Sequence, residues 1–473
     1  MYKVVIGLEV HCEVLTNSKN FSSARNTYSN VANENVAPVD LGLPGILPVP
    51  NQEAVHKALK TAMALNCTNP DEVIFDRKNY FYPDLPKGYQ ITQVTKPMGR
   101  NGYLMVPVGD QEIRVDIHQL HLEEDTASLE HFTNYSLIDY NRSGIPLMEI
   151  VTEPCIHSAE EAVAFLEALR SVFLYCGVSE AKSDKGQMRC DVNISLMEEG
   201  SEQLGTKVEM KNINAFNSVK AAIEYEIQRQ TEVLKSGGKV QQETRRYDEE
   251  DLKTYAMRNK VDAVDYKYFI EPNIPPVKLT KEYLESIRKE LPKLQYERRK
   301  QYMEEYDLSA YDATVLVREK PISDYYEEVL SYHIAPKAAV NWVMVILGSL
   351  NKLNITIDEM FIRPSMLADV IRLVEEKKLS LSQGKKILYQ AMDELVEPLE
   401  LIERLGIQQI DNDEELRQYV KEAVDQFPDV VAQYKEGKPW VANYFVGQVM
   451  KKTRGQANPA LTLNLIKEEL EKR

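Results

Sequence analysis

This chain of 473 residues has few cysteines, no excess of positive charge and no familiar nucleotide-binding motif. Each of these absences excludes a class of protein. Its 5 cysteines form no Cys-x-x-Cys pair, which argues against a zinc ribbon and against a disulfide scaffold. Acidic residues outnumber basic ones by 73 to 57, so a general basic coat for nucleic acid is excluded, although a local basic patch is not. Apolar residues at 43% and charged residues at 27% are typical of a globular protein.

Long apolar runs are also missing. The longest stretch, around Val340 to Leu350, contains Asn341 and is well short of the ~20 residues that a membrane-spanning helix needs. Near the N-terminus, Glu9 and His11 interrupt a segment that a signal peptide would keep apolar. We therefore expect a cytoplasmic protein without a membrane partner, in line with its use of cysteine.

The known phosphate-binding and hydrolase signatures are absent as well. The sequence has no G-x-x-x-x-G-K-[ST] loop, no G-x-G-x-x-G after a strand, no H-E-x-x-H and no G-x-S-x-G. Any nucleotide chemistry would therefore need a different kind of site.

Alternating apolar and polar residues predict several strands in the first half of the chain. The clearest strand runs from Tyr2 to Val14 and carries Glu9 and His11 on the face opposite to its apolar residues. Within 113–123 the alternation changes phase after Ile117, which predicts a β-bulge. Further strands are expected at 190–195 and 206–211.

Helices separate these strands without a regular strand–helix alternation. A capping box at Ser158 opens a helix that ends at Gly177, and a second helix runs from about 218 to Gly237. This order favours an α+β fold with a largely antiparallel sheet. The segment 271–276 reads as a domain edge, and helical spacing follows it at 280–291, 321–333, 338–350, 365–378 and 380–395.

The polar faces of the predicted strands carry an unusual number of acids. If these strands pair, several carboxylates and one imidazole converge, and a bound cation is the natural way to neutralise them. Oxygen-rich ligands suit Mg²⁺ or Mn²⁺. The alternative is a solvated strand face in an acidic protein. The residues concerned are Glu9, His11, Glu123, Glu124, Asp125, Asp191 and Glu209.

Two loops combine aromatic, amide and charged groups. Residues 75–90 hold aromatic rings beside basic side chains, a composition that suits stacking on a base and holding phosphates. Residues 139–149 present polar side chains at a glycine–proline turn. The alternative is that the aromatic rings belong to the core and the charges surround them.

Taken together, these motifs resemble the GatB family, the B subunits of tRNA-dependent amidotransferases. The resemblance extends along essentially the whole chain, in order, and includes the Gly447-Gln and Gly455-Gln-Ala-Asn-Pro459 segments near the C-terminus. The motifs of the first half are Val5-Ile-Gly-Leu-Glu-Val-His11, Leu41-Gly-Leu-Pro-Gly45, Phe75-Asp-Arg-Lys-Asn-Tyr-Phe-Tyr-Pro83, His121-Leu-Glu-Glu-Asp125, Arg189-Cys-Asp-Val-Asn-Ile-Ser195 and Gln242-Glu-Thr-Arg-Arg246.

The resemblance implies a three-part fold and a two-step amidation. The expected parts are a cradle-like catalytic domain at 1–292, a helical domain at 293–405 and a YqeY-like tail at 406–473. Members use ATP to phosphorylate the side-chain carboxylate of Glu-tRNA(Gln) or Asp-tRNA(Asn). The implied partners are the A and C subunits of the amidotransferase, in a heterotrimer. Ammonia made by the A subunit, a glutaminase, displaces phosphate, and the C subunit holds the other two together.

The resemblance also implies roles for individual residues. It implies ATP and Mg²⁺ or Mn²⁺ as cofactors, with His11 and Glu124 as catalytic residues. Where many members carry paired cysteines for zinc, this chain reads Phe21-Ser-Ser-Ala24, so no zinc is expected. The implied metal ligands are Glu9, His11, Glu123, Glu124, Asp191 and Glu209, and Lys87, Arg189 and Lys207 are implied contacts for phosphate or carboxylate.

A basic segment near the C-terminus is a candidate for binding tRNA. No acid occurs between Gly437 and Lys467, whereas Lys451, Lys452 and Arg454 add positive charge. This segment could instead dock on an acidic part of the complex. For the whole chain, the alternatives are a stand-alone metal-dependent ATPase or hydrolase and a catalytically decayed tRNA-binding scaffold.

Overall fold

A computed structural model describes residues 2–109, 111–201, 203–213, 215–257, 266–406, 413–435, 437–453 and 456–473. The chain divides into two compact units, residues 1–297 and 298–473. The first contains all the strands of the described residues, and the second is helical. This confirms the predicted α+β class.

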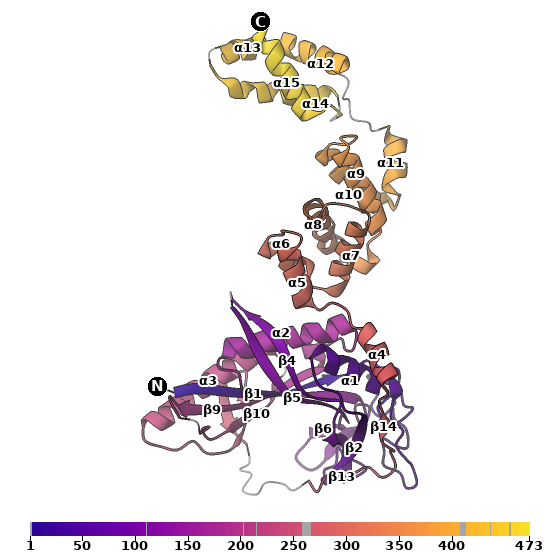
Figure 1. Cartoon of the computed structure of the whole chain (residues 1–473), viewed down its shortest axis with the longest axis vertical. Coiled ribbons are helices and arrows are strands. Elements are labelled where there is room, and N and C mark those ends of the chain that lie inside the picture. The colour runs from indigo at the N-terminus through magenta and orange to yellow at the C-terminus, as the bar shows by residue number, and fades with distance from the viewer. Residues whose placement is uncertain are drawn as a thin grey trace. The chain divides into compact units, whose positions relative to one another are not determined.

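An eight-stranded sheet forms the centre of the first unit (Figure 1). Its neighbours are antiparallel except for β10 and β11, so it is largely antiparallel, as predicted. In order across the sheet the strands are β12 (Lys253–Ala256), β11 (Thr244–Asp248), β10 (Val208–Ile213), β9 (Met188–Glu198), β1 (Tyr2–Glu13), β8 (Pro146–Thr152), β5 (Gln111–Glu124) and β4 (Gly99–Val108).

Helices cover one face of this sheet and build the core of the unit. In β1 the apolar residues Ile6, Leu8 and Val10 are fully buried, whereas Glu9 and His11 are only partly buried on the other face. The predicted alternation in β1 is therefore confirmed. The helices of the unit are α1 (Gln52–Ala64), α2 (Ala159–Cys176), α3 (Phe216–Lys235) and α4 (Lys281–Lys289).

Local sequence signals set the ends of these elements. The Ser158 hydroxyl accepts a hydrogen bond from the backbone N–H of Glu161, and α2 ends at Gly177 with φ of 66°. The predicted bulge is also confirmed: the pairing of β5 with β8 shifts between Ile117 and Gln119. Beyond this shift the side chains of β5 are in phase with those of β8 and β1, which brings Glu123 to the polar face.

Shorter strands stand apart from the large sheet. Four form a small sheet around β2, and two form a hairpin. The small sheet holds β2 (Glu72–Asn79), β3 (Tyr89–Lys96), β13 (Phe269–Ile270) and β14 (Val277–Lys278), and the hairpin is β6 (Ser128–His131) with β7 (Ser136–Asp139). The chain between β2 and β3 belongs to the aromatic segment 75–90.

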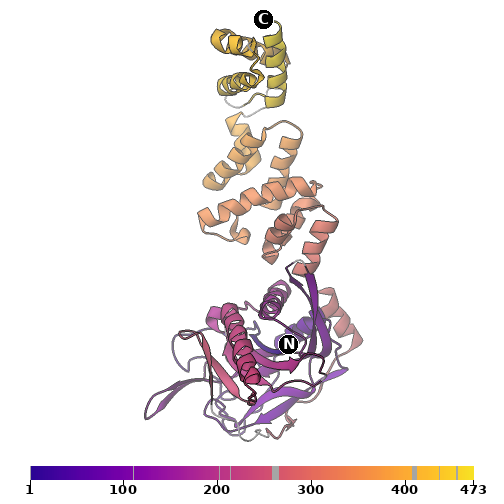
Figure 2. The ribbon, with the colours of Figure 1, turned by 90° about the vertical axis from the view of Figure 1, so that its left-hand side faces the viewer.

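The second unit has two separate apolar cores, one within residues 302–401 and one within 416–470. Its helices run in orange to yellow in Figure 2. They are α5 (Gln295–Glu304), whose first residues precede the unit boundary, α6 (Ala310–Leu316), α7 (Lys320–Ser331), α8 (Pro336–Leu353), α9 (Pro364–Glu375), α10 (Leu381–Glu394), α11 (Pro398–Leu405), α12 (Asp413–Gln426), α13 (Pro428–Lys435), α14 (Ala442–Lys452) and α15 (Pro459–Glu471). None of the helices in the described ranges is long and apolar enough to cross a membrane.

One organisational prediction is wrong. The segment 271–276 is not a domain edge, because β14 and α4 follow it and still belong to the first unit. β14 pairs with β2, and Glu290 after α4 lies 2.8 Å from His56 of α1. Proline and glycine interrupt secondary structure without deciding where the chain packs next. The three-part division at residues 292 and 405 stays a prediction.

A close approach between β4 and the end of α1 supplies a test of this packing. A Cβ on Gly102 would lie 2.4 Å from Cys67 Sγ and 2.5 Å from the carbonyl oxygen of Leu65. We expect Gly102→Ala to lower the free energy of unfolding by about 1–3 kcal/mol, because a backbone carbonyl cannot move aside cheaply. Gly348→Ala in α8, where nothing lies within 4 Å, should instead be neutral or stabilising. Urea unfolding measures both, and equal effects would contradict this account of the contact.

Candidate functional site

The polar face of the large sheet brings residues from four neighbouring strands together. Glu149 of β8 is directly opposite His11 of β1 and His121 of β5. On the other side of β1, His11 is opposite Arg189 of β9. Directly opposed residues of antiparallel strands point to the same face, so these four side chains form one row across the sheet.

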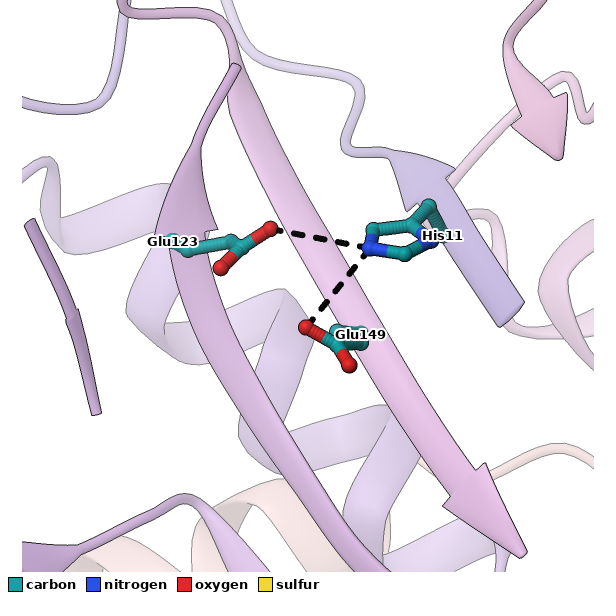
Figure 3. A group of neighbouring side chains, drawn as sticks. All are labelled: His11, Glu123 and Glu149. Carbon is teal, nitrogen blue, oxygen red and sulfur yellow. Dashed lines mark ion pairs between the residues drawn. The ribbon is translucent and has the colours of Figure 1, made fainter. Parts of the chain in front are cut away.

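Two carboxylates and one imidazole in this region converge on a small volume (Figure 3). Nε2 of His11 lies 3.8 Å from Glu123 Oε1 and 3.6 Å from Glu149 Oε2. Figure 3 shows the two carboxylates directed toward the imidazole from two adjacent strands. Three ligand atoms, one from each residue, lie within 4.8 Å of one another. We call His11, Glu123 and Glu149 the first acidic group.

A second histidine balances the charge of this group. Nε2 of His121 lies 3.0 Å from Glu149 Oε2 and 3.5 Å from Glu123 Oε2. Burial disfavours the charged imidazole, but Glu149 and Glu123 outweigh burial and raise the pKa of His121 to about 10. Burial by itself would raise the pKa of Glu149, because it disfavours the charged carboxylate. His121 and His11 nevertheless hold this pKa well below its usual range.

Glu9, Asp191 and Glu209 form a second acidic group, from β1, β9 and β10. One carboxylate oxygen from each lies within 4.8 Å of the others. Burial and the neighbouring Glu149 raise the pKa of Glu9, although Asn193 donates a hydrogen bond of 2.8 Å to its carboxylate. Thr244 of β11 donates to Glu209 at 2.9 Å and fixes that side chain from the other side.

A lysine lies beside the second group. Nζ of Lys211 is 2.9 Å from Glu209 and 3.2 Å from Asp191. Burial disfavours its charge, but the two carboxylates outweigh burial and raise the pKa of Lys211. Lys211 is two residues after Glu209 in β10 and shares its face. Each acidic group therefore lies beside a cation, His121 for the first and Lys211 for the second, with which a bound metal ion would have to share carboxylates.

Glu124 lies in neither acidic group and is held by β3 and the loop before it. Lys87 Nζ donates to both of its carboxylate oxygens at 2.7 and 2.6 Å, and the backbone N–H of Ile91 donates at 2.9 Å. Glu124 is only 2% exposed, so this pairing replaces most of its contact with water. Lys87, implied as a contact for phosphate or carboxylate, thus pairs directly with Glu124, implied as a metal ligand and catalytic residue.

The remaining predicted residues occupy different surroundings. Arg189 lies 3.0 Å from Asp125, whose carboxylate outweighs burial and raises the pKa of the guanidinium. Lys207 is exposed just before β10, whereas Lys211 makes the contact with Asp191. In the tail, Lys451 is exposed at the end of α14, and Lys452 lies 3.2 Å from Glu422. Arg454 lies outside the described residues.

Sequence reasoning missed Glu149, His121 and Lys211 as members of this region. The available signal for Glu149 was a single acid within the apolar strand 146–152, and for Lys211 it was the shared face with Glu209. Both signals are local, whereas the role of Glu149 depends on β8 lying between β1 and β5. The sequence of one strand does not show which other strands pair with it in the sheet.

Both groups fit a divalent cation by their donor chemistry. The first offers one imidazole nitrogen and two carboxylates, which suits Mn²⁺ or Mg²⁺, and the second offers three carboxylates, which suits Mg²⁺. The spacing within 4.8 Å allows the three atoms of each group to contact one ion. A cation bound in either group would add positive charge to a face that already carries Arg189 and Lys211.

Comparison with known proteins identifies the family. Residues 4–285 match the family described as the GatB/GatE catalytic domain, and residues 324–470 match the GatB domain. The chain belongs to the GatB family. A protein of Persephonella marina, named as the B subunit of aspartyl/glutamyl-tRNA(Asn/Gln) amidotransferase, is 46% identical over 471 residues, 99% of each chain. Proteins of the same name from Halalkalibacterium halodurans and Brevibacillus brevis are 46% and 43% identical and cover 100% and 99% of each chain.

Membership in the GatB family confirms the resemblance that the motifs indicated. The first match covers β1 to most of α4 and so includes both acidic groups, and the second covers most of the helical unit. The matches to these relatives extend over 99% or more of each sequence. The polar face described above is thus part of the family's catalytic domain.

The cation His121 gives the site a testable pH dependence. We expect His121→Gln to lower the free energy of unfolding at pH 7 by about 1–3 kcal/mol, because it removes a positive charge that lies 3.5 Å from Glu123 and 3.0 Å from Glu149 and leaves His11 beside them. His121 has a raised pKa, so its contribution is complete below pH 6.5 and is lost as the pH rises through about 10. The gap between wild type and variant in the free energy of unfolding should therefore narrow toward pH 10. Urea unfolding followed by circular dichroism, with a chelator present, measures this gap.

The matched control is His118→Gln, at the bulge of β5, where an exposed histidine faces the exposed Glu153. It should change stability by less than ~0.5 kcal/mol. Similar losses for both variants, or a gap for His121 that widens with pH, would contradict the assigned charge.

Proposed function

We propose that this chain is the B subunit that activates and amidates misacylated tRNA in an amidotransferase. It uses ATP to phosphorylate the side-chain carboxylate of Glu-tRNA(Gln), Asp-tRNA(Asn) or both. Ammonia then displaces the phosphate and gives Gln-tRNA(Gln) or Asn-tRNA(Asn). The observation that carries the proposal is the pair of acidic groups on one face of the catalytic domain. The names of the full-length relatives supply the substrate class.

The chemistry explains why such a face is useful. A carboxylate is a poor acyl donor, because its charge repels nucleophiles and oxide does not leave. Phosphorylation removes both obstacles, but the transferring phosphoryl group carries charge that must be stabilised. A divalent cation bound by His11, Glu123 and Glu149, or by Glu9, Asp191 and Glu209, would supply that stabilisation.

The chain's own cations complete the proposed site. Lys87 and Arg189 are paired with Glu124 and Asp125 and lie at the same end of β5, where they can hold phosphate or carboxylate oxygens. Glu124 in turn orients the Lys87 ammonium, because both of its carboxylate oxygens accept from Lys87 while the backbone N–H of Ile91 holds the carboxylate. We assign Glu124 and His11 to the phosphoryl-transfer step.

Ammonia comes from elsewhere in this proposal. The A subunit hydrolyses glutamine, and the C subunit holds the A and B subunits together, as the resemblance to the family implies. An acyl phosphate is hydrolysed by water, so the proposed site must keep water away until ammonia arrives. This division of labour makes the chain a ligase component that does not produce ammonia.

The first test changes a ligand that the first acidic group needs. In the assembled complex, Glu149→Gln should keep basal glutamine hydrolysis but lower ATP-dependent amidation of tRNA on the order of 100-fold or more, because a ligand to the cation is lost. Ammonium salts as the nitrogen source should not restore it. The control is Glu130→Gln at an exposed position of β6, which should amidate like wild type. Amidated tRNA is measured directly.

Three results would contradict the proposal. One is amidation by Glu149→Gln at the wild-type rate. Another is failure of ammonium salts to support a complex whose glutaminase site is inactivated. The last is rapid ATP turnover by the purified chain without tRNA and partners, which would favour a stand-alone ATPase.

We further propose that the tail binds tRNA through its basic residues. Changing Lys451 to Ala should weaken tRNA binding and lower the slope of log affinity against log salt by about 1, as expected for one lost phosphate contact. Lys452→Ala should have a smaller effect, because Glu422 already pairs with Lys452. Lys385→Ala, an exposed lysine of α10, is the control. An unchanged salt series for Lys451→Ala would remove this residue from the binding surface.

A further inference from the structure

The loop between β2 and β3 presents an aromatic ring to solvent. Phe81 is 95% exposed, more than any other large apolar side chain in the described part of the chain, and Tyr82 beside it is 49% exposed. Single apolar residues on a surface are common and need no explanation by themselves. The surroundings of Phe81 are what make its exposure informative.

The loop that carries Phe81 is held in place by several contacts. The backbone N–H of Ala127 donates to the carbonyl of Asp84 at 3.1 Å, and the hydroxyl of Tyr140 donates to the carbonyl of Pro83 at 3.4 Å. Leu85 in the same loop is buried. An exposed ring on a fixed loop loses little conformational freedom when a ligand covers it.

Gly88 closes the loop against the same ring. Its φ is +77°, a conformation that favours glycine, and a Cβ there would lie 3.1 Å from Cε1 of Phe81. The ring therefore lies next to the backbone that directly follows Lys87. The same short segment therefore carries both the ring and Lys87, which reaches Glu124 at 2.6 Å.

We propose that Phe81 stacks on the unpaired 3′-terminal adenine of the substrate tRNA. This inference rests on the proposed function. The reacting amino acid is esterified to the terminal ribose, so the terminal base must lie close to the site whenever the carboxylate is in it. Bases at single-stranded ends stack on aromatic side chains.

The exposure of the ring favours the tRNA end over the adenine of ATP. A small nucleotide is usually held in a concave pocket that buries most of its surface. A ring that is 95% exposed is instead suited to a strand end that lies across it. The aromatic side chains of Tyr80 and Tyr89 are more buried than Phe81. Each already has a cation of the protein over its ring, Lys78 for Tyr80 and Arg77 for Tyr89.

A thermodynamic cycle tests the contact. Dissociation constants are measured for the complex with its partner subunits, using intact tRNA and tRNA that lacks the terminal adenosine. In wild type, removal of the adenosine should weaken binding roughly 5- to 100-fold. In Phe81→Ala the two tRNAs should bind equally. Phe81→Tyr keeps an aromatic face and should retain the difference, whereas Phe81→Leu keeps apolar volume only and should lose it.

The same proteins are assayed for amidation, with KM determined separately for aminoacyl-tRNA and ATP. A rise in KM for tRNA alone supports the proposal, whereas a rise in KM for ATP alone overturns it and points to the nucleotide. An equal loss on removal of the adenosine in wild type and Phe81→Ala also overturns it. If that loss is equal and both proteins still amidate tRNA, the stacking proposal is wrong but the proposed function stands. Failure of wild type to bind either tRNA would reject the proposed function itself.

Discussion

The position of β8 between β1 and β5 is the constraint on which the candidate site depends. It places the Glu149 carboxylate between two imidazoles, those of His11 and His121. A buried carboxylate is costly unless positive charge is close, and a buried imidazolium is costly unless negative charge is close. The pKa of His121 at about 10 and the depressed pKa of Glu149 show that each group stabilises the charged form of the other.

Charge balance also separates the acids of this face into two kinds. Glu124 and Asp125 are paired with Lys87 and Arg189, side chains that come from another strand or loop and hold them in place. Within each acidic group the ligand atoms lie within 4.8 Å of one another, and the nearby cations are His121 for the first group and Lys211 for the second. A cation is favoured where like charges gather, so the second kind is where we propose that a metal ion binds.

Local sequence patterns predicted those features that neighbouring residues decide. Alternation identified β1 and its polar face, the change of phase after Ile117 identified the bulge, and Ser158 with Gly177 identified the ends of α2. These features follow from backbone geometry over a few residues. The domain edge expected at 271–276 was wrong, because pairing of β14 with β2 is a contact between residues about 200 positions apart.

The sequence by itself determined which side chains are polar, which face of each strand they occupy, and, through its motifs, the GatB family. It identified five of the six acidic-group residues, His11, Glu123, Glu9, Asp191 and Glu209. Only the tertiary structure decided that Glu149 completes the first group, that Glu124 belongs with Lys87, and that Lys211 and not Lys207 contacts Asp191. The physical reason is that a strand's own residues fix the direction of its side chains, whereas the order and register of the strands in the sheet fix which side chains meet.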